Sequence, residues 1–417
     1  MTRLIELVKT ILIVLLICSL VLLTVASVPT HTLREIPWLS TLLQPIAPLI
    51  GLPQAELAYV AAAPAIQDAA KPLVISVNNS AGRSTAQWSF TELDTRFDSL
   101  GRYLGQALDT AETFTKVSQP QLQTALTAES IYFGYGAPLP PAVVASWLGA
   151  SLEAAVPDTE AFLLSVNGSA VELYLMGETA YVSATPLSAA ELRGLLDNYR
   201  PDSSCFAFET DYPLPPLTLI PGEQIVLSGG SATDSVTGRF VEQLATDLGF
   251  NPYGESRYTD NDGGIHFSEA NCALEITTGG QILLTAAEGR FEAAGPDQAA
   301  LAELARQLTD LATGGNPGRA RLYLTGITET ETGTVCTFDY HFSGIPVMLD
   351  RGSAATVTFT GQSVTGMTVH PYTFSANAEN IYPLPIAQAA ALLPDGTPLT
   401  LRYRLTADGV LEAGWKK

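Results

Sequence analysis

The residues whose types and spacing come nearest to a functional site lie together between Tyr258 and Glu269. Read as a twelve-residue calcium loop, this stretch has acids at positions three and five, glycine at six and Glu269 at twelve. Tyr258 stands at position one, however, where the loop needs an oxygen donor, and the residues after Gly264 alternate as in a strand. We therefore predict a turn through 261–264 that feeds an antiparallel strand, and no metal site.

Histidine is scarce, which limits the ways in which the chain could bind a metal. The four histidines are His31, His266, His341 and His370. No two of them have the HExxH or Hx3H spacing that places a metal-binding pair on one helix. His266 and His341 fall within predicted strands, where we interpret them as satisfied sheet residues and not as ligands.

Motifs for nucleophilic catalysis and phosphate binding are also missing or misplaced. The nearest approach to Gly-x-Ser-x-Gly is Gly361 to Gly366, which has the wrong spacing and lies among predicted strands. Gly314, Gly315 and Gly318 follow a predicted helix instead of opening one, which indicates a C-cap and a turn. The sequence therefore predicts no catalytic, cofactor-binding or metal-binding residues and no cofactor, so we expect no enzyme.

The cysteines give no clearer indication of a site. Cys18 lies in an apolar N-terminal segment, whereas Cys205, Cys272 and Cys336 have apolar neighbours, which favours buried thiols. These three residues allow at most one disulfide. The chain has no CxxC pair that could hold zinc or act as a redox site.

The composition fits folded, sheet-rich domains with an acidic surface. The chain has 417 residues, 47% of them hydrophobic and 15% charged, so two or three domains with sizeable cores are expected. Asp and Glu total 42 against 21 Lys and Arg, which gives a formal net charge of -21. Such a surface repels phosphate backbones, so nucleic acid is a poor partner.

The N-terminus carries a membrane segment. Thr10 to Val28 holds no charge and reaches the roughly 20 apolar residues needed to cross a bilayer. Arg3 and Lys9 precede it, so residues 1–9 are predicted to be a cytoplasmic tail and the bulk of the chain to be extracytoplasmic. A cleavable signal peptide is the alternative, because residues 25–27 resemble a cleavage site, but the apolar run exceeds the usual length of roughly 7–15 residues.

Beyond the membrane segment the pattern predicts an α+β fold of antiparallel sheets with packed helices. Residues 29–72 are rich in proline and form a juxtamembrane spacer. An N-terminal domain is predicted at 73–222, with a helix at 90–108 that has one apolar stripe. Two glycosylation sequons, at Asn78 and Asn167, are explained by hairpin turns, the second of them predicted at Asn167-Gly168.

The remaining sequence repeats this order of elements. We predict a middle α+β domain at 223–313 and a C-terminal α+β domain at 314–417. Helices are expected at 234–248 and 296–311, each followed by alternating strands, and a last hairpin turns at Asp408-Gly409. A helix-then-meander unit, used more than once, is typical of α+β proteins.

Three stretches of the chain resemble the YycH/YycI family of regulators. They run from Phe133 to Gly149, from Gly249 to Leu284, and from Phe338 to Val347. The family consists of single-pass, N-in membrane proteins of Gram-positive bacteria whose ectodomains modulate the sensor histidine kinase WalK. The resemblance implies a sensor histidine kinase and a paralogous regulator as protein partners, and it supplies no catalytic residues. The Ala-, Thr- and Gly-rich acidic composition departs from the family.

Two functions are therefore carried forward. The first is a non-enzymatic regulator in the cell membrane that contacts a two-component sensor histidine kinase through its membrane helix and its ectodomain (residues 29–417). The alternative is a cell-envelope enzyme or ligand-binding protein with a cleft that the sequence does not reveal. A deep pocket with convergent polar groups would favour the alternative, and sheet faces without one would favour the regulator.

Overall fold

Antiparallel sheets with helices packed against them make up the fold, which is α+β as predicted. This computed structural model describes residues 66–222, 224–234, 236–269, 271–287, 289–315, 317–394 and 396–416. The predicted tail at 1–9, the membrane helix at 10–28 and the spacer as far as residue 65 lie outside the described residues. Among the described residues, no helix has both the length and the apolar character needed to cross a membrane.

The first sheet has seven strands in the order β2-β1-β4-β5-β6-β7-β3, and all neighbouring strands are antiparallel. Its strands are β1 (Val74–Asn79), β2 (Gly82–Gln87), β3 (Thr115–Lys116), β4 (Ser130–Leu139), β5 (Thr159–Asn167), β6 (Ala170–Met176) and β7 (Tyr181–Thr185). The β5–β6 hairpin turns at Gly168 and Ser169, one residue later than predicted, because Asn167 still pairs with Ala170.

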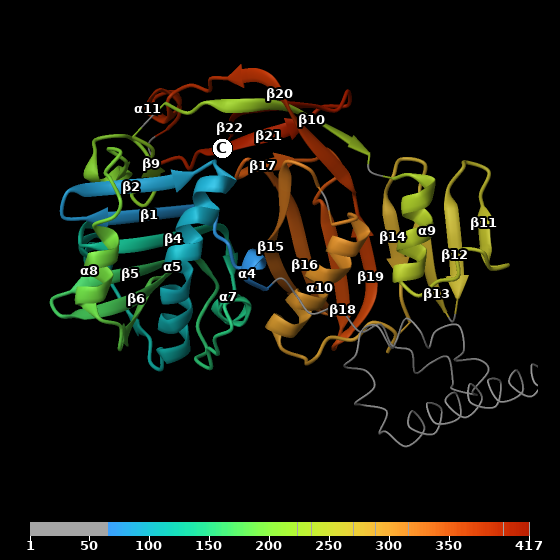
Figure 1. Ribbon diagram of the computed structural model, residues 1–417, viewed down its shortest axis with the longest axis horizontal. Helices are drawn as coiled ribbons and strands as arrows, with labels where there is room; N and C mark the ends of the chain where they lie inside the picture. The colour runs from blue at the N-terminus through green and yellow to red at the C-terminus, as the bar shows by residue number, and fades with distance from the viewer. Residues whose placement is uncertain are drawn as a thin grey trace, which may run out of the picture. The chain divides into compact units, whose positions relative to one another are not determined.

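Helices cover both faces of the first sheet. They are α4 (Ile66–Ala69), α5 (Phe90–Thr110), α6 (Gln119–Thr127), α7 (Pro141–Trp147) and α8 (Ala189–Leu196). Helix α6 packs on Ala161 and Leu163 of β5. The intervening Phe162 and Leu164 are also fully buried, and they point to the opposite face because strand side chains alternate. Figure 1 shows α5 and α8 in front of the sheet.

The predicted apolar stripe of α5 is confirmed. Its members are Leu93, Phe97, Leu100, Leu104 and Leu108, and all of them are buried. Ser89 caps the helix by accepting a hydrogen bond from the Glu92 N–H, which satisfies one of the free amides of the first turn.

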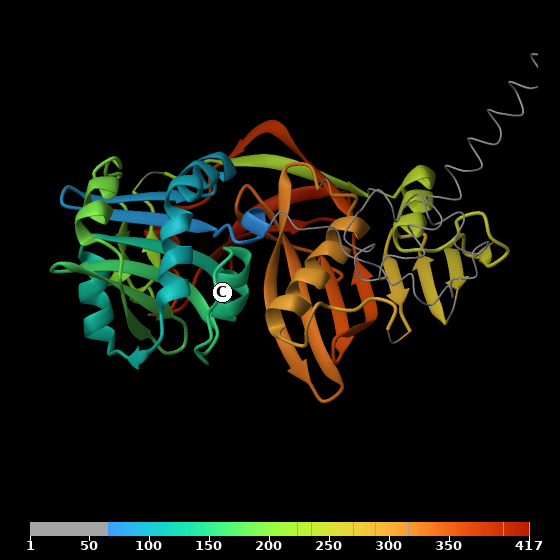
Figure 2. The same ribbon diagram turned by 60° about the horizontal axis from the view of Figure 1, so that its bottom comes forward.

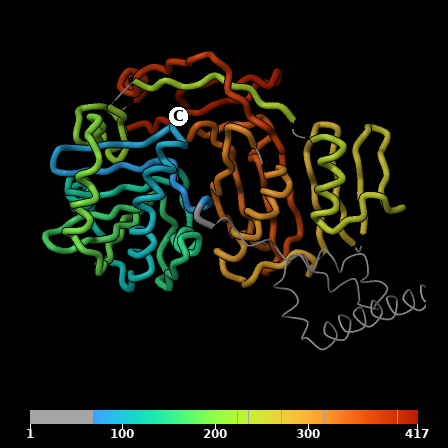
Figure 3. The backbone as a smooth tube through the Cα atoms, viewed as in Figure 1, coloured from blue at the N-terminus to red at the C-terminus, as the bar shows by residue number. Residues whose placement is uncertain are grey.

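The second sheet has thirteen strands, in the order β11-β12-β13-β14-β19-β18-β16-β17-β21-β22-β10-β20, with β15 paired to β16. They are β10 (Leu227–Asp234), β11 (Arg257–Thr259), β12 (Ile265–Glu269), β13 (Cys272–Ile276), β14 (Ile282–Thr285), β15 (Ala320–Thr330), β16 (Gly333–Phe342), β17 (Ile345–Met348), β18 (Ala355–Thr360), β19 (Ser363–Val369), β20 (Tyr372–Ile381), β21 (Thr400–Leu405) and β22 (Val410–Lys416). Strands β17 and β21 run parallel. Figure 3 shows β10 beside β20, two strands far apart in the sequence.

This sheet takes strands from both the 223–313 and the 314–417 ranges, so the predicted boundary at 313 falls between strands of one sheet. Residues 63–417 belong to one unit. The three domain ranges stay predictions. Two short strands, β8 (Cys205–Phe206) and β9 (Leu219–Ile220), form a small sheet of their own within the proline-rich segment that precedes β10.

Three further helices accompany the second sheet: α9 (Gly238–Asp247), α10 (Gln298–Ala312) and α11 (Ile386–Ala390). Helix α10 packs on β15, β16 and β18, and it also touches α7 (Figure 1, Figure 2). The helix predicted at 234–248 starts only at Gly238, because Asp234 still belongs to β10 and the Thr237 side chain caps α9.

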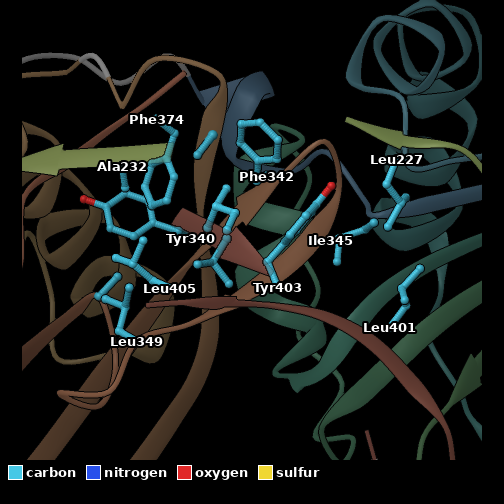
Figure 4. Close-up of a cluster of buried hydrophobic side chains, with 14 of the residues drawn as sticks. Leu227, Ala232, Tyr340, Phe342, Ile345, Leu349, Phe374, Leu401, Tyr403 and Leu405 are labelled. Atoms are coloured by element: carbon cyan, nitrogen blue, oxygen red, sulfur yellow. The ribbon is translucent and has the colours of Figure 1, made fainter. Parts of the chain in front are cut away.

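An aromatic cluster forms the core where β16, β17, β20 and β21 meet (Figure 4). Phe342 meets Tyr403 edge to face with ring centroids 5.4 Å apart, and Tyr340 lies 4.9 Å from Phe374. These four rings are at most 1% exposed. Each buried aromatic side chain contributes a large apolar area, so this cluster fixes the strands that form one wall of the candidate site described next.

Candidate functional site

A cleft of about 660 Å³ lies between residues of the first sheet and residues of the second. We call it the inter-sheet cleft. The first sheet contributes residues of β1 and β4 and the end of β2, and the second contributes the β16–β17 hairpin and β21. Its volume falls within the range of small-molecule sites, roughly 300–1,000 Å³. The residues that the argument uses are Gln87, Trp88, Asp339, His341, Gly344 and Arg402.

Gln87 and Trp88 are placed by an abrupt change from strand to helix. Strand β2 ends at Gln87, Ser89 already caps α5, and Trp88 makes the reversal alone with a φ of 62°. A bulky residue in this left-handed region is a genuine conformational outlier that costs on the order of 1–3 kcal/mol. Such strain persists only where the surroundings enforce it, and here the β16–β17 hairpin does so.

The tip of that hairpin is pressed against the Trp88 backbone. Phe342 pairs with Ile345, so Ser343 and Gly344 form a two-residue turn, with φ values of 53° and 81°. Positive φ at both central residues defines the type I′ turn that suits a twisted hairpin. A Cβ atom on Gly344 would lie 3.2 Å from the Trp88 Cα, so this position needs glycine for its space as well as for its φ.

His341 lines this cleft, and one nitrogen of its ring is buried without a hydrogen-bond partner among the described residues. Its side chain is 3% exposed, its ring meets Tyr323 edge to face at 4.9 Å, and its Nδ1 has no hydrogen-bond partner among the described residues. Burial lowers the pKa of His341 to about 4, although a hydrogen bond with the Asp339 backbone opposes the shift. The imidazole is therefore neutral at physiological pH. His341 lies in a strand as predicted, but it is not a fully satisfied sheet histidine.

Gln87, which also lines the cleft, has a buried side-chain atom without a partner in the part of the chain that the structure describes. Its Oε1 is buried and has no hydrogen-bond partner among the described residues. Unpaired buried polar atoms are uncommon in folded proteins and cost about 1–3 kcal/mol each. Nothing in the sequence near Gln87 indicates this placement, because it depends on the left-handed Trp88.

The charged residues of the cleft lining are Asp339 and Arg402. Asp339 accepts hydrogen bonds from the Thr325 hydroxyl at 2.8 Å and from the Ala354 N–H at 3.2 Å, so its two oxygens link β16 to β15 and to the residue before β18. Arg402 makes an exposed contact with the Met348 sulfur at 3.5 Å. The lining thus carries one charge of each sign, and the carboxylate is already committed.

A polar cluster of Asp94, Arg321 and Lys71, which we call the polar clasp, joins helix α5 to strand β15. The Arg321 guanidinium donates to both oxygens of Asp94, at 2.8 and 2.6 Å, and lies over the Phe90 ring at 4.2 Å. The Lys71 ammonium lies 3.1 Å from the same carboxylate. Burial alone would raise the pKa of Asp94, but the hydrogen bonds from Arg321 and Lys71 lower it. Bidentate pairing of this kind fixes orientation as well as distance.

The cleft shows no arrangement for nucleophilic catalysis. None of the serine or threonine side chains that line it in the described part of the chain hydrogen bonds to the His341 ring. A histidine with a pKa of about 4 is also a weak base at neutral pH. The arrangement can bind and orient a ligand through hydrogen bonds and apolar contact.

The predicted turn between Tyr258 and Glu269 is confirmed. Strands β11 and β12 form an antiparallel hairpin, and Asp260 accepts the N–H groups of Asp262 and Gly264. The other Asp260 oxygen lies 2.8 Å from His266 Nε2, and these contacts lower the pKa of the Asp260 carboxyl. Glu269 accepts the Asn251 N–H at 2.9 Å. No group of three or more potential metal ligands occurs among the described residues.

The other predicted positions lie outside the cleft. Gly314 and Gly315 end α10 with positive φ and a bond from the Gly315 N–H to the Asp310 carbonyl, which confirms the C-cap. Gly361 lies in the turn between β18 and β19. His370 is buried, which lowers its pKa, and His31 lies outside the described residues.

Cysteines and sequons likewise have structural roles. Cys272 and Cys336 are buried free thiols as predicted, whereas Cys205 is half-buried. Burial raises the pKa of Cys336 to about 12. The Asn78 amide donates to the Thr127 and Ala128 carbonyls, and the Asn167 amide donates to Glu172.

Comparison with family models, curated proteins and solved structures finds no match to this chain.

Proposed function

We propose that the chain is a non-enzymatic, membrane-anchored extracytoplasmic regulator of a two-component sensor histidine kinase. It acts by protein contact through its N-terminal helix and its ectodomain. The uncharged run from Thr10 to Val28, preceded by Arg3 and Lys9, supports the anchor and its N-in orientation. The helix-then-meander order, with α9 before β11–β14 and α10 before β15–β19, supports a repeated unit within the ectodomain.

The observation that carries this proposal is the meeting of two distant stretches at one cleft. Residues 133–149 and 338–347 both carry the resemblance to the regulator family, and they lie about 200 positions apart in the sequence. Gly136, Ala137 and Pro138 from the first stretch line the inter-sheet cleft together with His341 and Gly344 from the second. Two of the three segments that resemble the regulator family thus share one place in the fold.

An exposed apolar group beside α11 supports contact with a protein partner. Tyr382, Leu384 and Leu392 are 60%, 50% and 76% exposed, and they flank a helix that packs on the 214–220 segment. Large apolar side chains gathered on a surface are typical of interaction sites. Confinement of both proteins to one membrane raises their effective concentration, so a weak ectodomain interface suffices.

The test is co-purification from membranes combined with a kinase-dependent transcription reporter. We expect the full-length chain to recover a sensor histidine kinase, together with a paralogous regulator. Replacing residues 1–28 by an unrelated membrane helix should weaken regulation, and an ectodomain released in soluble form should abolish it at native abundance. A soluble ectodomain that regulates as well as the anchored chain would reject the mechanism. No kinase recovered and no reporter change on deletion would reject the regulatory assignment itself.

The second candidate is a cell-envelope ligand-binding protein, and the cleft itself favours it. A cleft of about 660 Å³ has the size expected of a ligand pocket, and its lining includes apolar side chains such as Trp88, Val347 and Leu401. The two candidates are compatible, since a regulator can bind a small ligand. Retention of regulation by a variant with its cleft filled would separate them.

A further inference from the structure

Two cavities of the molecule adjoin each other along strand β21. The first is the inter-sheet cleft, and the second is a groove of about 420 Å³ on the β21–β22 hairpin, which we call the hairpin groove. Met348, Leu349 and Arg402 line both of them. Because they share these residues, the hairpin groove lies at the rim of the cleft, and one elongated ligand can occupy both.

The cleft presents apolar side chains that the fold leaves partly open to solvent. Apolar lining residues with partial exposure include Val74, Trp88, Leu219, Leu399 and Trp415. Removing such surface from water is favourable in proportion to the apolar area that is covered. The interior of the cleft is therefore suited to an apolar group.

The charged groups of the cleft lining favour an anion at the rim and not in the interior. Asp339 already accepts hydrogen bonds with both of its oxygens, from Thr325 and from Ala354. The cation of the lining is Arg402, and it belongs to the rim because it also lines the hairpin groove. A ligand with a negative end would thus place that end beside Arg402.

Arg402 is a cation that no carboxylate of the described residues neutralises. Its guanidinium contacts the Met348 sulfur at 3.5 Å in an exposed position, and it forms no ion pair within the described part of the chain. Lys416, which lines the hairpin groove, has no ion pair there either. In the hairpin register Arg402 stands opposite Gly414 and Lys416 stands opposite Thr400. Neither cation therefore has a charged residue directly across from it.

The carboxylates of the hairpin groove lie towards its other end. Glu412 stands directly opposite Arg404, two residues further along β21 than Arg402. Asp350 follows the last paired residues of β17 and β21, which are Met348 and Arg404. The end of the groove that adjoins the cleft is therefore cationic, in a chain whose formal net charge is -21.

We propose that the inter-sheet cleft binds a single-chain anionic lipid, with its apolar chain between the two sheets and its carboxylate or phosphate head at Arg402 and Lys416. Both kinds of head can accept two parallel hydrogen bonds from a guanidinium. The lipid site rests on the second candidate function, a ligand-binding cleft, and assigns the class of its ligand. It requires no sensor kinase, so a failure of the reporter experiment leaves it intact.

The experiment is photolabelling of the full-length chain in lipid nanodiscs, followed by mass spectrometry of its peptides. The probes are dodecanoic acid with a diazirine on its chain, the corresponding dodecyl phosphate and the corresponding neutral dodecanol. Labelling of the nanodisc scaffold protein normalises the yields. We expect label on the peptides that contain Trp88, Leu219 and Leu399, with an apparent dissociation constant of about 100 µM or tighter for a charged probe.

The three heads separate the sources of the charge. At least one charged probe should bind about fivefold or more tightly than dodecanol, because only a charged head pairs with Arg402. The tighter of the acid and the phosphate identifies the head that the site prefers.

Two variants test the two ends of the site. Arg402→Gln removes the charge at the rim and should weaken the charged probes by about fivefold while leaving dodecanol unchanged. Its matched control is Arg239→Gln, at an exposed arginine of α9 outside both cavities, which should change nothing. Ala137→Trp fills part of the cleft and should weaken all three probes by at least about fivefold. Thermal unfolding establishes that each variant is folded.

Three results would overturn the lipid site. Without label on the cleft peptides beyond the level that excess unlabelled acid leaves, the cleft would belong to a protein segment or to another ligand. Equal affinity of dodecanol and both charged probes would contradict the anionic head. Unchanged affinity in both Arg402→Gln and Ala137→Trp would place the probe elsewhere. The second candidate function itself fails only if a variant with its cleft filled regulates normally, so the two failures can be told apart.

Discussion

The burial of His341 predicts a specific loss of stability in mild acid. Its pKa is about 4 in the folded chain against 6.5 for an unperturbed histidine, so between these values the unfolded chain binds more protons than the folded one. Stability therefore rises with pH across this window. It is fully present above pH 6.5 and is lost as the pH falls towards 4. His370, whose pKa is also lowered by burial, acts in the same direction.

The size of the effect follows from the shift. A difference of about 2.5 pH units at about 1.4 kcal/mol per unit gives a total of about 3.5 kcal/mol, of which about 2 kcal/mol is lost by pH 5. The perturbation that isolates it is His341→Phe, which keeps an aromatic ring against Tyr323 and removes the titrating group. We expect this variant to match or exceed the wild-type stability at pH 7.5, because an unpaired buried nitrogen is removed.

The assay compares thermal unfolding of the full-length chain and of His341→Phe from pH 7.5 down to pH 5. The gap in Tm should widen by about 4 °C over this range, at roughly 2 °C per kcal/mol for a large domain. A ring-labelled NMR titration gives an independent readout, since the chain has four histidines and single substitutions can assign them. Parallel pH profiles of the two proteins, or an apparent pKa near 6.5 for His341, would refute the reasoning.

Three more outcomes follow from the geometry. Asp94→Ala should lower stability by about 2 kcal/mol, because it removes the bidentate partner of Arg321 and one of the two carboxylates beside Lys71. The control Asp68→Ala, at an exposed carboxylate, should cost less than about 1 kcal/mol in urea unfolding. Equal effects of the two substitutions would contradict the clasp. Gly344→Ala should lower Tm more than Gly361→Ala, because both turns have positive φ but only Gly344 also faces the Trp88 backbone. The reverse order of Tm values would contradict the inference that the Gly344 turn fixes the Trp88 backbone. Glu269→Gln should fold and regulate normally, since a glutamine oxygen can still accept the Asn251 N–H. Calorimetry tests this prediction. The calcium loop would be revived if the wild type bound stoichiometric calcium in the micromolar range and this variant did not.

Elements stabilised by their own residues could be predicted from the sequence. The stripe from Leu93 to Leu108 defines α5 whatever lies beyond it, because a period of three and four places these side chains on one face. The caps at Ser89 and Ser188 and the glycines at 314 and 315 are local in the same way. Hairpins such as β5–β6 and β21–β22 could be predicted from the alternation of apolar and polar residues in their strands and from the turn residues between them.

Strand β10 could not be predicted from its own residues, because contacts with distant parts of the chain determine it. Leu227 to Asp234 includes two adjacent glycines and lacks an alternating apolar pattern. A Cβ atom on Gly229 would lie 2.4 Å from Asn377, and one on Gly230 would lie 2.9 Å from Phe342, so both glycines serve distant neighbours. The same holds for the cleft. His341 could be named from the sequence, but its unpaired Nδ1 and the left-handed Trp88 result from the meeting of two sheets.

The insertion of the β21–β22 hairpin between β17 and β10 has a consequence for the order of folding. Strand β10 pairs with β20 and β22, and Tyr403 donates a hydrogen bond to the Ser228 carbonyl across 175 positions. At synthesis rates of roughly 5–20 residues per second, about 10–35 s pass between the synthesis of β10 and that of its partners β20 and β22. The first sheet, complete by residue 185, can close long before. An exported chain would therefore present an open sheet edge during translocation, which is the stage at which chaperones and envelope proteases would meet it.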